Sequence, residues 1–322
     1  MAAMMTKSAV KVLVPQGWVA RLEDEAARRA LAVSWVGYGE GGGGPAAGAE
    51  VFFRPDHAPR WQEALAAAPD VRWLHTTSAG VDPILPLAAP RGIAVTESGT
   101  VYRIAMGEFV MAQMLFMAKH LADHRDHQLA GRWQFVKHEE LYGRTCGIVG
   151  LGPIGLGVAE RAAAFGMPLI GCRRSGRPVE GVTDVVPPAG LARLWRESDY
   201  IVLACPLTSE TRHIVGAAAL AAMKSGARLI NIARGALVDT EALVAALQAD
   251  RLGGAALDVT DPEPPPPGHP LWRLPNVLLT PHNAPGNTDA LNGRKLDLFL
   301  DNLGRYLAGQ PLLNLVDPVR GY

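Results

Sequence analysis

The sequence is poor in cysteine and has no surplus of charge of either sign. Its three cysteines are far apart, and each falls in an apolar run with the character of a strand: Cys146, Cys172 and Cys205. An odd number of dispersed thiols in such runs argues against a disulfide framework. Lys and Arg together number 31, as do Asp and Glu, so the formal net charge is zero. Binding of nucleic acid or of an anionic membrane through bulk electrostatics is therefore not expected.

An export signal and a long hydrophobic run are also missing. Residues 1–14 contain no charged segment followed by an extended apolar one. The most apolar helical pattern, at residues 104–118, is interrupted by Glu108 and Gln113 and is shorter than the roughly 20 residues that span a hydrocarbon core. We therefore expect a cytoplasmic protein with reduced thiols and no membrane partner.

The composition is that of a folded chain. Hydrophobic residues make up 48% of the 322 residues, which excludes disorder over most of the length. At about 100–200 residues per domain, this length predicts two domains, each large enough to bury its own core.

Short β-rich runs alternate with helical patterns, which predicts an α/β fold with parallel sheets. A first series has strands at 10–14, 32–36, 51–53, 71–76 and 93–96, with helices at 18–29 and 61–68. A second series has six apolar strands, the number of a full dinucleotide-binding sheet, at 146–149, 168–172, 200–205, 228–232, 255–259 and 277–280. A last helix at 288–307, with Asn287 as its N-cap, is predicted to pack back on the first domain.

The strongest local motif is Gly150-Leu151-Gly152-Pro153-Ile154-Gly155, which follows one predicted strand and opens a helix. In this context the first glycine permits a tight turn and the second lets a pyrophosphate approach the backbone. The third allows helix and strand to pack closely, while the helix N-terminus faces the anion. The motif predicts a dinucleotide site.

The next strand ends in Cys172-Arg173-Arg174-Ser175, without the acidic residue that would bind the ribose 2′-hydroxyl of NAD. Two guanidinium groups at this position suit a 2′-phosphate, because they bind it through paired hydrogen bonds. NADP is therefore the preferred cofactor and NAD the alternative. The competing interpretation is a pair of solvated arginines.

Three other patterns are assigned no catalytic role. Residues 41–44 are four glycines, which we interpret as a surface turn because no Lys-Ser/Thr pair follows them. Residues 264–267 are four prolines, interpreted as a stiff connection that fixes the direction of Glu263. His120, His124 and His127 share roughly one helical face, but nothing in the predicted chemistry needs a metal there, so none is expected.

Further motifs occur in a fixed order along the chain: Ser78-Ala79-Gly80-Val81-Asp82, Pro206-Leu207-Thr208 with Thr211, Ile230-Asn231-Ile232-Ala233-Arg234-Gly235, Leu257-Asp258-Val259, Glu263-Pro264 and Thr280-Pro281-His282. With the glycine motif, they resemble the D-isomer-specific 2-hydroxyacid dehydrogenase family, in particular its glyoxylate/hydroxypyruvate reductases. The resemblance implies a Rossmann dinucleotide-binding domain at 101–282. This domain would be inserted into a discontinuous, flavodoxin-like α/β substrate domain formed by 1–100 and 283–322.

The resemblance also implies three catalytic residues. Arg234 would hold the substrate carboxylate and polarise the keto oxygen, a task that suits a planar guanidinium. His282 would be the acid/base, and imidazole suits this role because it generally titrates near neutral pH. Glu263 would pair with the histidine. Alone, each has an ordinary structural explanation: a salt bridge, a structural histidine and a solvated loop acid.

Binding residues are implied in the same way. The backbone of Ser78, Ala79 and Gly80 would bind the substrate carboxylate, together with Arg234 and His282. The cofactor would contact the glycine motif and the 173–175 segment, and also Pro153, Ile154, Pro206, Thr211, Ile232 and Asp258, the last through the nicotinamide amide. The resemblance further implies a homodimer that uses helices such as 104–118.

The expected activity is NAD(P)H-dependent reduction of a small 2-oxo acid, of the glyoxylate or hydroxypyruvate type, to the D-2-hydroxy acid. The alternative is a non-catalytic, dinucleotide-sensing protein like the C-terminal-binding protein corepressors, which share the fold. The residues after His282 depart from the family pattern, beginning with Asn283. Tyr102 and Arg103 either contact the far end of the substrate or simply pack at a hinge.

Overall fold

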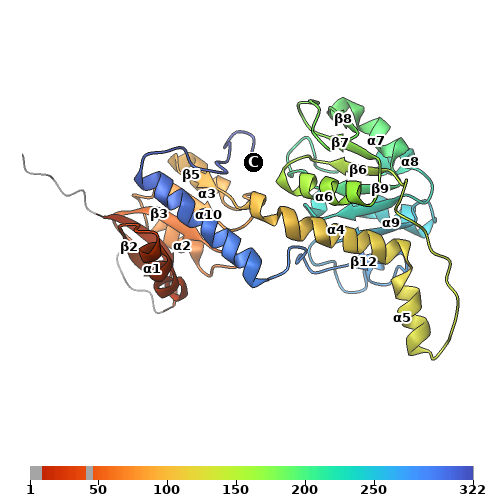
Figure 1. The fold of residues 1–322 in the computed structure, drawn as a ribbon, viewed down its shortest axis with the longest axis horizontal. Helices are drawn as coiled ribbons and strands as arrows, with labels where there is room; N and C mark the ends of the chain where they lie inside the picture. Colours follow the sequence, from red (N-terminus) through yellow and green to blue (C-terminus); the bar gives the residue numbers. More distant parts are fainter. Residues whose placement is uncertain (1–8, 41–45, 322) are drawn as a thin grey trace, which may run out of the picture. The chain divides into compact units, whose positions relative to one another are not determined.

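A computed structural model of the chain describes residues 9–40 and 46–321. It divides into two compact units, Met1–Val101 with Asn287–Tyr322, and Tyr102–Gly286 (Figure 1). The domain borders expected from the sequence stood at 100/101 and 282/283. The glycine turn predicted at 41–44 lies outside the described residues.

The first unit is built on a sheet of five parallel strands in the order β2-β1-β3-β4-β5. This is the flavodoxin-like order. The strand ends lie within two residues of the predicted ones: β1 Val10–Pro15, β2 Val33–Tyr38, β3 Ala49–Arg54, β4 Trp73–Thr76 and β5 Ala94–Thr96.

Helices cover both faces of this sheet because its strands are apolar on both sides. Val12 and Val14 of β1 point to a core that includes side chains of α1 and α10, and Leu13 points to a second core with α2 and α3. This alternation follows from the two-residue repeat of a strand. The helices are α1 Val19–Arg28, α2 Trp61–Ala66, α3 Leu85–Ala88 and α10 Asp289–Leu307.

Helix α10 packs on the first unit's sheet, as predicted, although more than 180 residues of chain separate it from β5. Its Phe299 ring lies 4.3 Å from the ring of Phe53, centroid to centroid. The predicted N-cap was wrong by one residue: the Thr288 hydroxyl accepts the hydrogen bond from the Leu291 amide. Asn287 instead accepts a bond from the Asn292 side chain.

The second unit holds a sheet of seven parallel strands in the order β12-β11-β10-β9-β6-β7-β8. The expectation of six strands was wrong, because the short β8 (Asp184–Val186) extends the edge beside β7. Three residues that include a charge give too weak a periodic pattern to be found. The other strands are β6 Cys146–Val149, β7 Leu169–Cys172, β9 Tyr200–Leu203, β10 Arg228–Asn231, β11 Gly254–Leu257 and β12 Val277–Leu279.

The helices of this unit include a long, largely apolar one, α4. They are α4 Arg103–Ala118, α5 Leu121–Leu129, α6 Pro153–Ala164, α7 Leu191–Glu197, α8 Ala217–Ala222 and α9 Thr240–Gln248. With the turn before α4, the helical stretch Gly99–Ala118 has 20 residues, so the prediction that it is too short for a membrane was wrong on length. Glycines bring α4 against α6: a Cβ on Gly107 would lie 2.6 Å from the Gly157 carbonyl oxygen. This helix therefore serves as packing in the second unit.

The described residues also form six short 3-10 turns: η1 Gln16–Trp18, η2 Ala89–Arg91, η3 Gly99–Tyr102, η4 Pro188–Gly190, η5 Gly235–Leu237 and η6 Pro270–Trp272.

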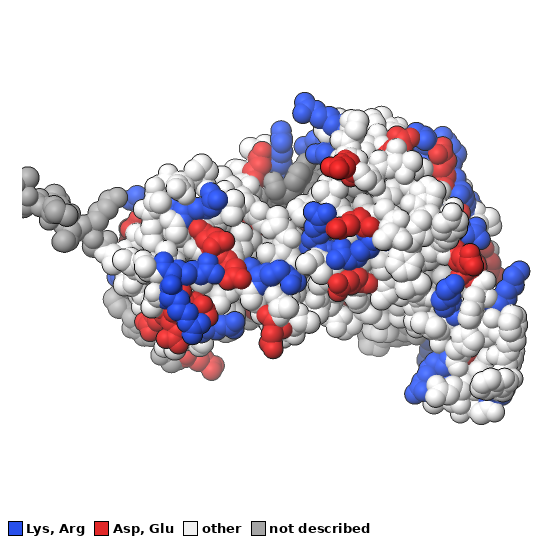
Figure 2. Space-filling view, in the orientation of Figure 1, with Lys and Arg blue, Asp and Glu red and all other residues white. Residues whose placement is uncertain are grey.

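On the face shown in Figure 2, basic and acidic side chains lie among one another, as the balanced composition leads one to expect. Exposed pairs such as Arg193 with Asp184, 2.5 Å apart, contribute little to stability because water screens them.

Candidate active site

The glycine motif lies at the topological switch point of the second unit's sheet. The chain runs from β6 outward to β7 and β8, and then returns to β9 on the other side of β6. The loop after β6 therefore opens into the crevice where ligands bind in such sheets. A Cβ on Gly150 would lie 2.6 Å from the Cys205 amide nitrogen, which follows β9, and its φ of +105° also requires glycine.

The other two glycines of the motif differ in their surroundings. A Cβ on Gly155 would lie 1.9 Å from the Gly150 carbonyl oxygen, so only glycine allows α6 to start this close to the strand. Gly152 has open space where its Cβ would be and serves as the N-cap of α6. An uncrowded backbone before a helix N-terminus is a cradle for an anion, so the loop fits a dinucleotide pyrophosphate.

The arginine segment follows β7 at the same edge of the sheet. The Arg173 amide donates to the Val186 carbonyl, which fixes the start of the turn. The Arg174 guanidinium lies 3.5 Å from the Glu210 carboxylate, and both side chains are exposed. The Ser175 hydroxyl accepts from the Arg177 amide at 3.3 Å. Two exposed cations in a fixed turn fit a phosphate, and Glu210 would compete with it for Arg174.

The segment after β9 is a turn closed by one hydroxyl. Thr211 Oγ1 donates to the Pro206 carbonyl at 2.7 Å and accepts from the Thr208 amide at 2.7 Å. Both bonds hold the hydroxyl inside the turn, so Thr211 shapes this rim of the crevice. Ile232, after β10, is buried at 7% exposure.

Arg234 is held by a buried asparagine at the end of β10. Asn231, 1% exposed, donates from Nδ2 to the Arg234 carbonyl at 2.8 Å and accepts from the Ala233 amide at 3.1 Å. The following Gly235 is forced by close packing, because a Cβ there would lie 1.9 Å from the Thr260 carbonyl oxygen. The Arg234 loop and the loop after β11 are therefore in contact.

Glu263 and His282 form a direct pair. His282 Nδ1 lies 2.7 Å from Glu263 Oε1, with about half of each side chain exposed. An ionised carboxylate only accepts, so Nδ1 donates and Nε2 is left for a ligand. His282 has a φ of +51°, uncommon for a residue with a Cβ. Its amide donates to the Asp258 and Thr280 carbonyls, which hold that conformation.

Asp258 has a role that the sequence did not reveal. The residue is 2% exposed and its carboxylate accepts three bonds: from the Thr280 hydroxyl at 2.7 Å and from the amides of Asn283 and Ala284 at 3.0 and 2.9 Å. These bonds fasten the chain on both sides of His282. The nicotinamide contact expected of Asp258 stays a prediction.

The three expected catalytic residues thus follow three neighbouring strands. Arg234 comes after β10, Glu263 after β11 and His282 after β12, and these strands are adjacent in the sheet. Since all are parallel, their carboxyl ends meet at one edge. An imidazole paired with a carboxylate, beside a guanidinium, can exchange a proton with a bound oxygen and stabilise negative charge on it.

The Ser78 loop belongs to the first unit and follows β4. The Ser78 amide donates to the Thr76 hydroxyl at 3.2 Å, so it is occupied. Within the described residues, the amides of Ala79 and Gly80 have no hydrogen-bond partner. These two, rather than Ser78, are the donors that fit a carboxylate.

The remaining candidates lie elsewhere or serve as packing. Tyr102 is 5% exposed, and Arg103 pairs with Glu160 of α6 at 3.1 Å, which favours the hinge-packing interpretation. His124 Nε2 lies 2.7 Å from His138 Nε2, whereas His120 pairs with Asp123. The three histidines therefore do not converge on one point. All three cysteines are buried and free.

Known proteins resemble this chain in both sequence and fold. The sequence profile of the D-isomer specific 2-hydroxyacid dehydrogenase NAD-binding domain matches residues 111–284. The chain belongs to this family. A glyoxylate reductase from Thermofilum pendens is 38% identical over 256 residues, which cover 77% of this chain and 75% of the relative. Membership in the D-isomer specific 2-hydroxyacid dehydrogenases confirms the predicted α/β fold with a Rossmann domain and the predicted oxidoreductase class.

Solved structures of D-isomer specific 2-hydroxyacid dehydrogenases match nearly the whole chain. One from Xanthobacter autotrophicus, in complex with NADPH and MES, has a TM-score of 0.84 at 30% identity and covers 98% of this chain and 100% of its own. An NADPH-dependent glyoxylate/hydroxypyruvate reductase from Sinorhizobium meliloti, in complex with NADP and sulfate, has a TM-score of 0.81 at 27% identity, with coverages of 97% and 100%. The homodimer and the cytoplasmic location stay predictions.

Proposed function

We propose that the protein reduces a small 2-oxo acid, of the glyoxylate or hydroxypyruvate type, to the D-2-hydroxy acid with NADPH. The observation that carries the proposal is the Glu263–His282 pair, 2.7 Å between Oε1 and Nδ1, at the same sheet edge as Arg234. Relatives and structural neighbours named glyoxylate reductase and glyoxylate/hydroxypyruvate reductase support the substrate class.

For each charged part of the dinucleotide, the second unit offers groups that suit it. The open backbone at Gly152 and the N-terminus of α6 would hold the pyrophosphate. Arg173 and Arg174 would bind the 2′-phosphate, which an acid at this position would repel. When bound, the reduced nicotinamide supplies the hydride. The neighbours crystallised with NADPH and NADP support the preference for the phosphorylated cofactor.

The chain's own groups account for the rest of the reaction. His282, protonated on both ring nitrogens, donates the Nε2 proton to the keto oxygen as the carbonyl carbon accepts a hydride. Glu263 holds Nδ1 and stabilises the charged imidazolium before the transfer. Arg234 binds the carboxylate and stabilises negative charge that develops on the oxygen. In the reverse direction, neutral His282 accepts the hydroxyl proton.

The test is the absorbance of reduced nicotinamide with a panel of 2-oxo acids, using NADPH and NADH side by side. We expect oxidation with glyoxylate or hydroxypyruvate, faster with NADPH at equal low cofactor concentration. Tight binding of NADPH without oxidation by any acid would contradict the proposal and favour a dinucleotide-sensing protein. Turnover with NADH alone would refute the role of Arg173 and Arg174.

A further inference from the structure

We propose that Lys295, on α10, is a positioning residue that acts through Asp56 to hold the Ser78–Gly80 loop in the shape that binds the substrate carboxylate. The inference rests on the proposed function, because it assigns the amides of this loop to a 2-oxo acid. The proposal gives Lys295 no direct contact with the substrate.

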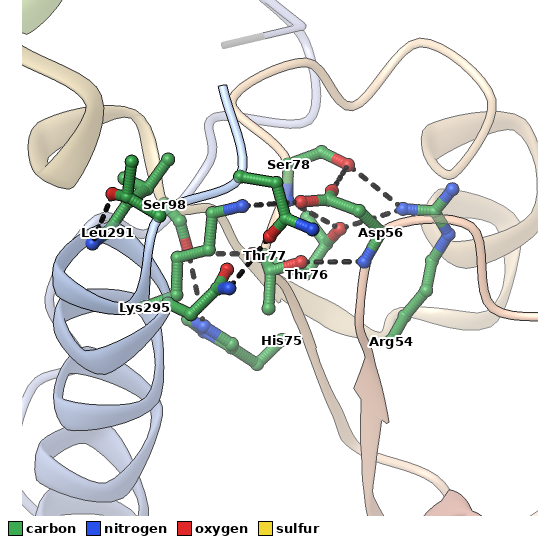
Figure 3. A network of polar contacts seen from close by, with 12 residues as sticks. Arg54, Asp56, His75, Thr76, Thr77, Ser78, Ser98, Leu291 and Lys295 are labelled. Atoms are coloured by element: carbon green, nitrogen blue, oxygen red, sulfur yellow. Dashed lines mark hydrogen bonds and ion pairs between the residues drawn. The ribbon is translucent and has the colours of Figure 1, made fainter. Parts of the chain in front are cut away.

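Lys295 is unusual because its charge is buried. It is 9% exposed and, with Arg228 and Asp258, is one of three buried residues carrying Lys, Arg, Asp or Glu side chains among those that the structure describes. Removing an ammonium group from water is costly unless it is paired. The partner is Asp56, whose Oδ2 accepts from Lys295 Nζ at 2.8 Å (Figure 3).

Asp56 carries the constraint onward to the loop. Its second oxygen, Oδ1, accepts from the Ser78 hydroxyl at 2.7 Å, and its amide donates to the Thr77 hydroxyl at 2.7 Å. Thr77 and Ser78 belong to the segment that follows β4. One carboxylate therefore ties a helix near the C-terminus to the residues just before Ala79 and Gly80.

The carboxylate is held in its charged form. Burial alone would raise the pKa of Asp56, but the hydrogen bonds from Lys295 and Ser78 outweigh that effect and leave the pKa below its ordinary value. An ionised Asp56 accepts bonds on both oxygens at once, as the geometry requires.

A second cation closes the network from the other side. Arg54, the last residue of β3, donates from Nη1 to the hydroxyls of Thr76 and Ser78 at 3.0 and 3.1 Å. Three successive hydroxyls, at residues 76, 77 and 78, are thus each fixed by a hydrogen bond to Arg54 or Asp56 (Figure 3). The free amides that follow are the groups whose direction this arrangement sets.

A purely structural role for the ion pair is the weaker explanation. Helix α10 is already held to the sheet by a row of buried apolar side chains, namely Leu296, Phe299, Leu300 and Leu303. A buried ion pair adds little stability compared with apolar residues of the same size. The ion pair instead fixes the orientation of the loop, because a hydrogen-bonded ion pair requires specific partners and a specific geometry.

The test compares Lys295→Met with the wild-type enzyme in two measurements. The first is the kinetics of glyoxylate reduction: we expect KM to rise about tenfold or more while kcat stays within about threefold, the pattern of lost binding. NADPH affinity should not change. The second is hydrogen exchange of the amides of Thr77 and Ser78, which are bonded to the Arg54 carbonyl and the Thr76 hydroxyl and should exchange about tenfold faster or more in the variant, because the loop opens more readily.

Matched variants separate positioning from general damage. Asp301→Asn breaks another ion pair on α10, with Arg29 at 2.7 Å, and should leave both KM and the loop exchange unchanged. Lys295→Arg keeps the charge, so its KM should lie much closer to the wild-type value than that of Lys295→Met. If Lys295→Met does not fold, Ser78→Ala removes only the hydroxyl link and should shift both measurements in the same direction.

The outcomes distinguish the two proposals. Wild-type exchange rates in Lys295→Met or Ser78→Ala would overturn the positioning role, whatever the kinetics. An unchanged KM in an enzyme that reduces glyoxylate would also overturn it and leave the proposed function standing. Absence of turnover in the wild type would refute the proposed function, while the exchange measurement would still decide whether Lys295 holds the loop.

Discussion

Two polar clusters in this protein are built in opposite ways. The Glu263–His282 pair is about half exposed, and its bonds leave one ring nitrogen open. The Asp56–Lys295 cluster is largely buried, with the lysine side chain 11% exposed, and both carboxylate oxygens of Asp56 are bonded. The first leaves a ring nitrogen to which a ligand can bind, whereas both carboxylate oxygens of the second already have partners.

The contrast distinguishes the pair proposed to perform chemistry from the groups proposed to hold backbone in place. An acid/base must meet its substrate and change its charge, so it needs access and an open bonding position. A supporting group must not change, so it is buried and its bonds are complete. Asp258 extends the rule within the second unit, since it is 2% exposed and its carboxylate makes all three of its hydrogen bonds to the segment around His282.

The largest expected effect comes from removing the exposed acid/base. His282→Ala should lower kcat by a factor of about 10³ or more, because the proton donor is lost, while NADPH affinity and the melting temperature stay close to wild type. Steady-state kinetics, cofactor titration and thermal unfolding measure the three quantities. His138→Ala, at another exposed histidine, is the control. Retained turnover in His282→Ala would reject the assignment.

A second exposed group should also affect function without affecting stability. Arg173→Asp is expected to weaken NADPH binding about tenfold to a hundredfold, because the new carboxylate repels the 2′-phosphate, and to change NADH binding far less. Titration with both cofactors gives the two dissociation constants. Arg177→Asp, in the same exposed turn, should have a smaller effect. Equal losses for NADPH and NADH would remove the argument for a phosphate site.

A buried supporting group should affect both properties. Asp258→Asn places an amide opposite backbone amides, so we expect a loss of about 1–3 kcal/mol in unfolding free energy and a roughly tenfold lower kcat. Denaturant unfolding and kinetics measure these. Asp261→Asn, at a half-exposed aspartate 3.7 Å from Arg212, is the control and should change neither by much. Normal stability with normal kcat in Asp258→Asn would show that the segment around His282 keeps its conformation without the Asp258 carboxylate.

The smallest effect is a pH dependence in the first unit. His75 is fully buried, and burial lowers its pKa from 6.5 to about 3. The unfolded chain therefore binds a proton below about pH 6.5 that the folded chain does not bind, so the unfolding free energy falls by only about 0.7 kcal/mol between pH 7 and pH 6, and by about 1.4 kcal/mol for each further pH unit down toward pH 3. Urea unfolding at several pH values should show a flatter dependence in His75→Gln. An identical slope in wild type and variant would mean that His75 is protonated in the folded state.

Much of the fold could be predicted because its strands are apolar and its helices periodic. The glycine motif even indicated the loop geometry, since Gly150 and Gly155 each lie where a Cβ would clash and Gly152 leaves the backbone open before the helix. What escaped prediction was local and weakly patterned. The edge strand β8 has three residues, and the N-cap of α10 was assigned to Asn287 although both Asn287 and Thr288 are capping residues by type.

The side chains proposed for catalysis could be picked out from the sequence, whereas those proposed to support them could not. Arg234, Glu263 and His282 sit in recognisable motifs after three successive strands. Lys295 and Asp56 are 239 residues apart, and each has the sequence character of an ordinary surface charge. The two side chains are buried and paired because α10 packs on the first unit's sheet, and no local sequence pattern indicates that packing.

The most direct test of the account is a double-mutant cycle on the exposed pair, made with Glu263→Gln and His282→Ala and read as kcat for glyoxylate reduction with NADPH. Because Glu263 acts through His282, its loss should cost about tenfold to a hundredfold in the wild type and almost nothing in His282→Ala. A full additional loss from Glu263→Gln in the His282→Ala background would contradict the claim that the two side chains work as one acid/base.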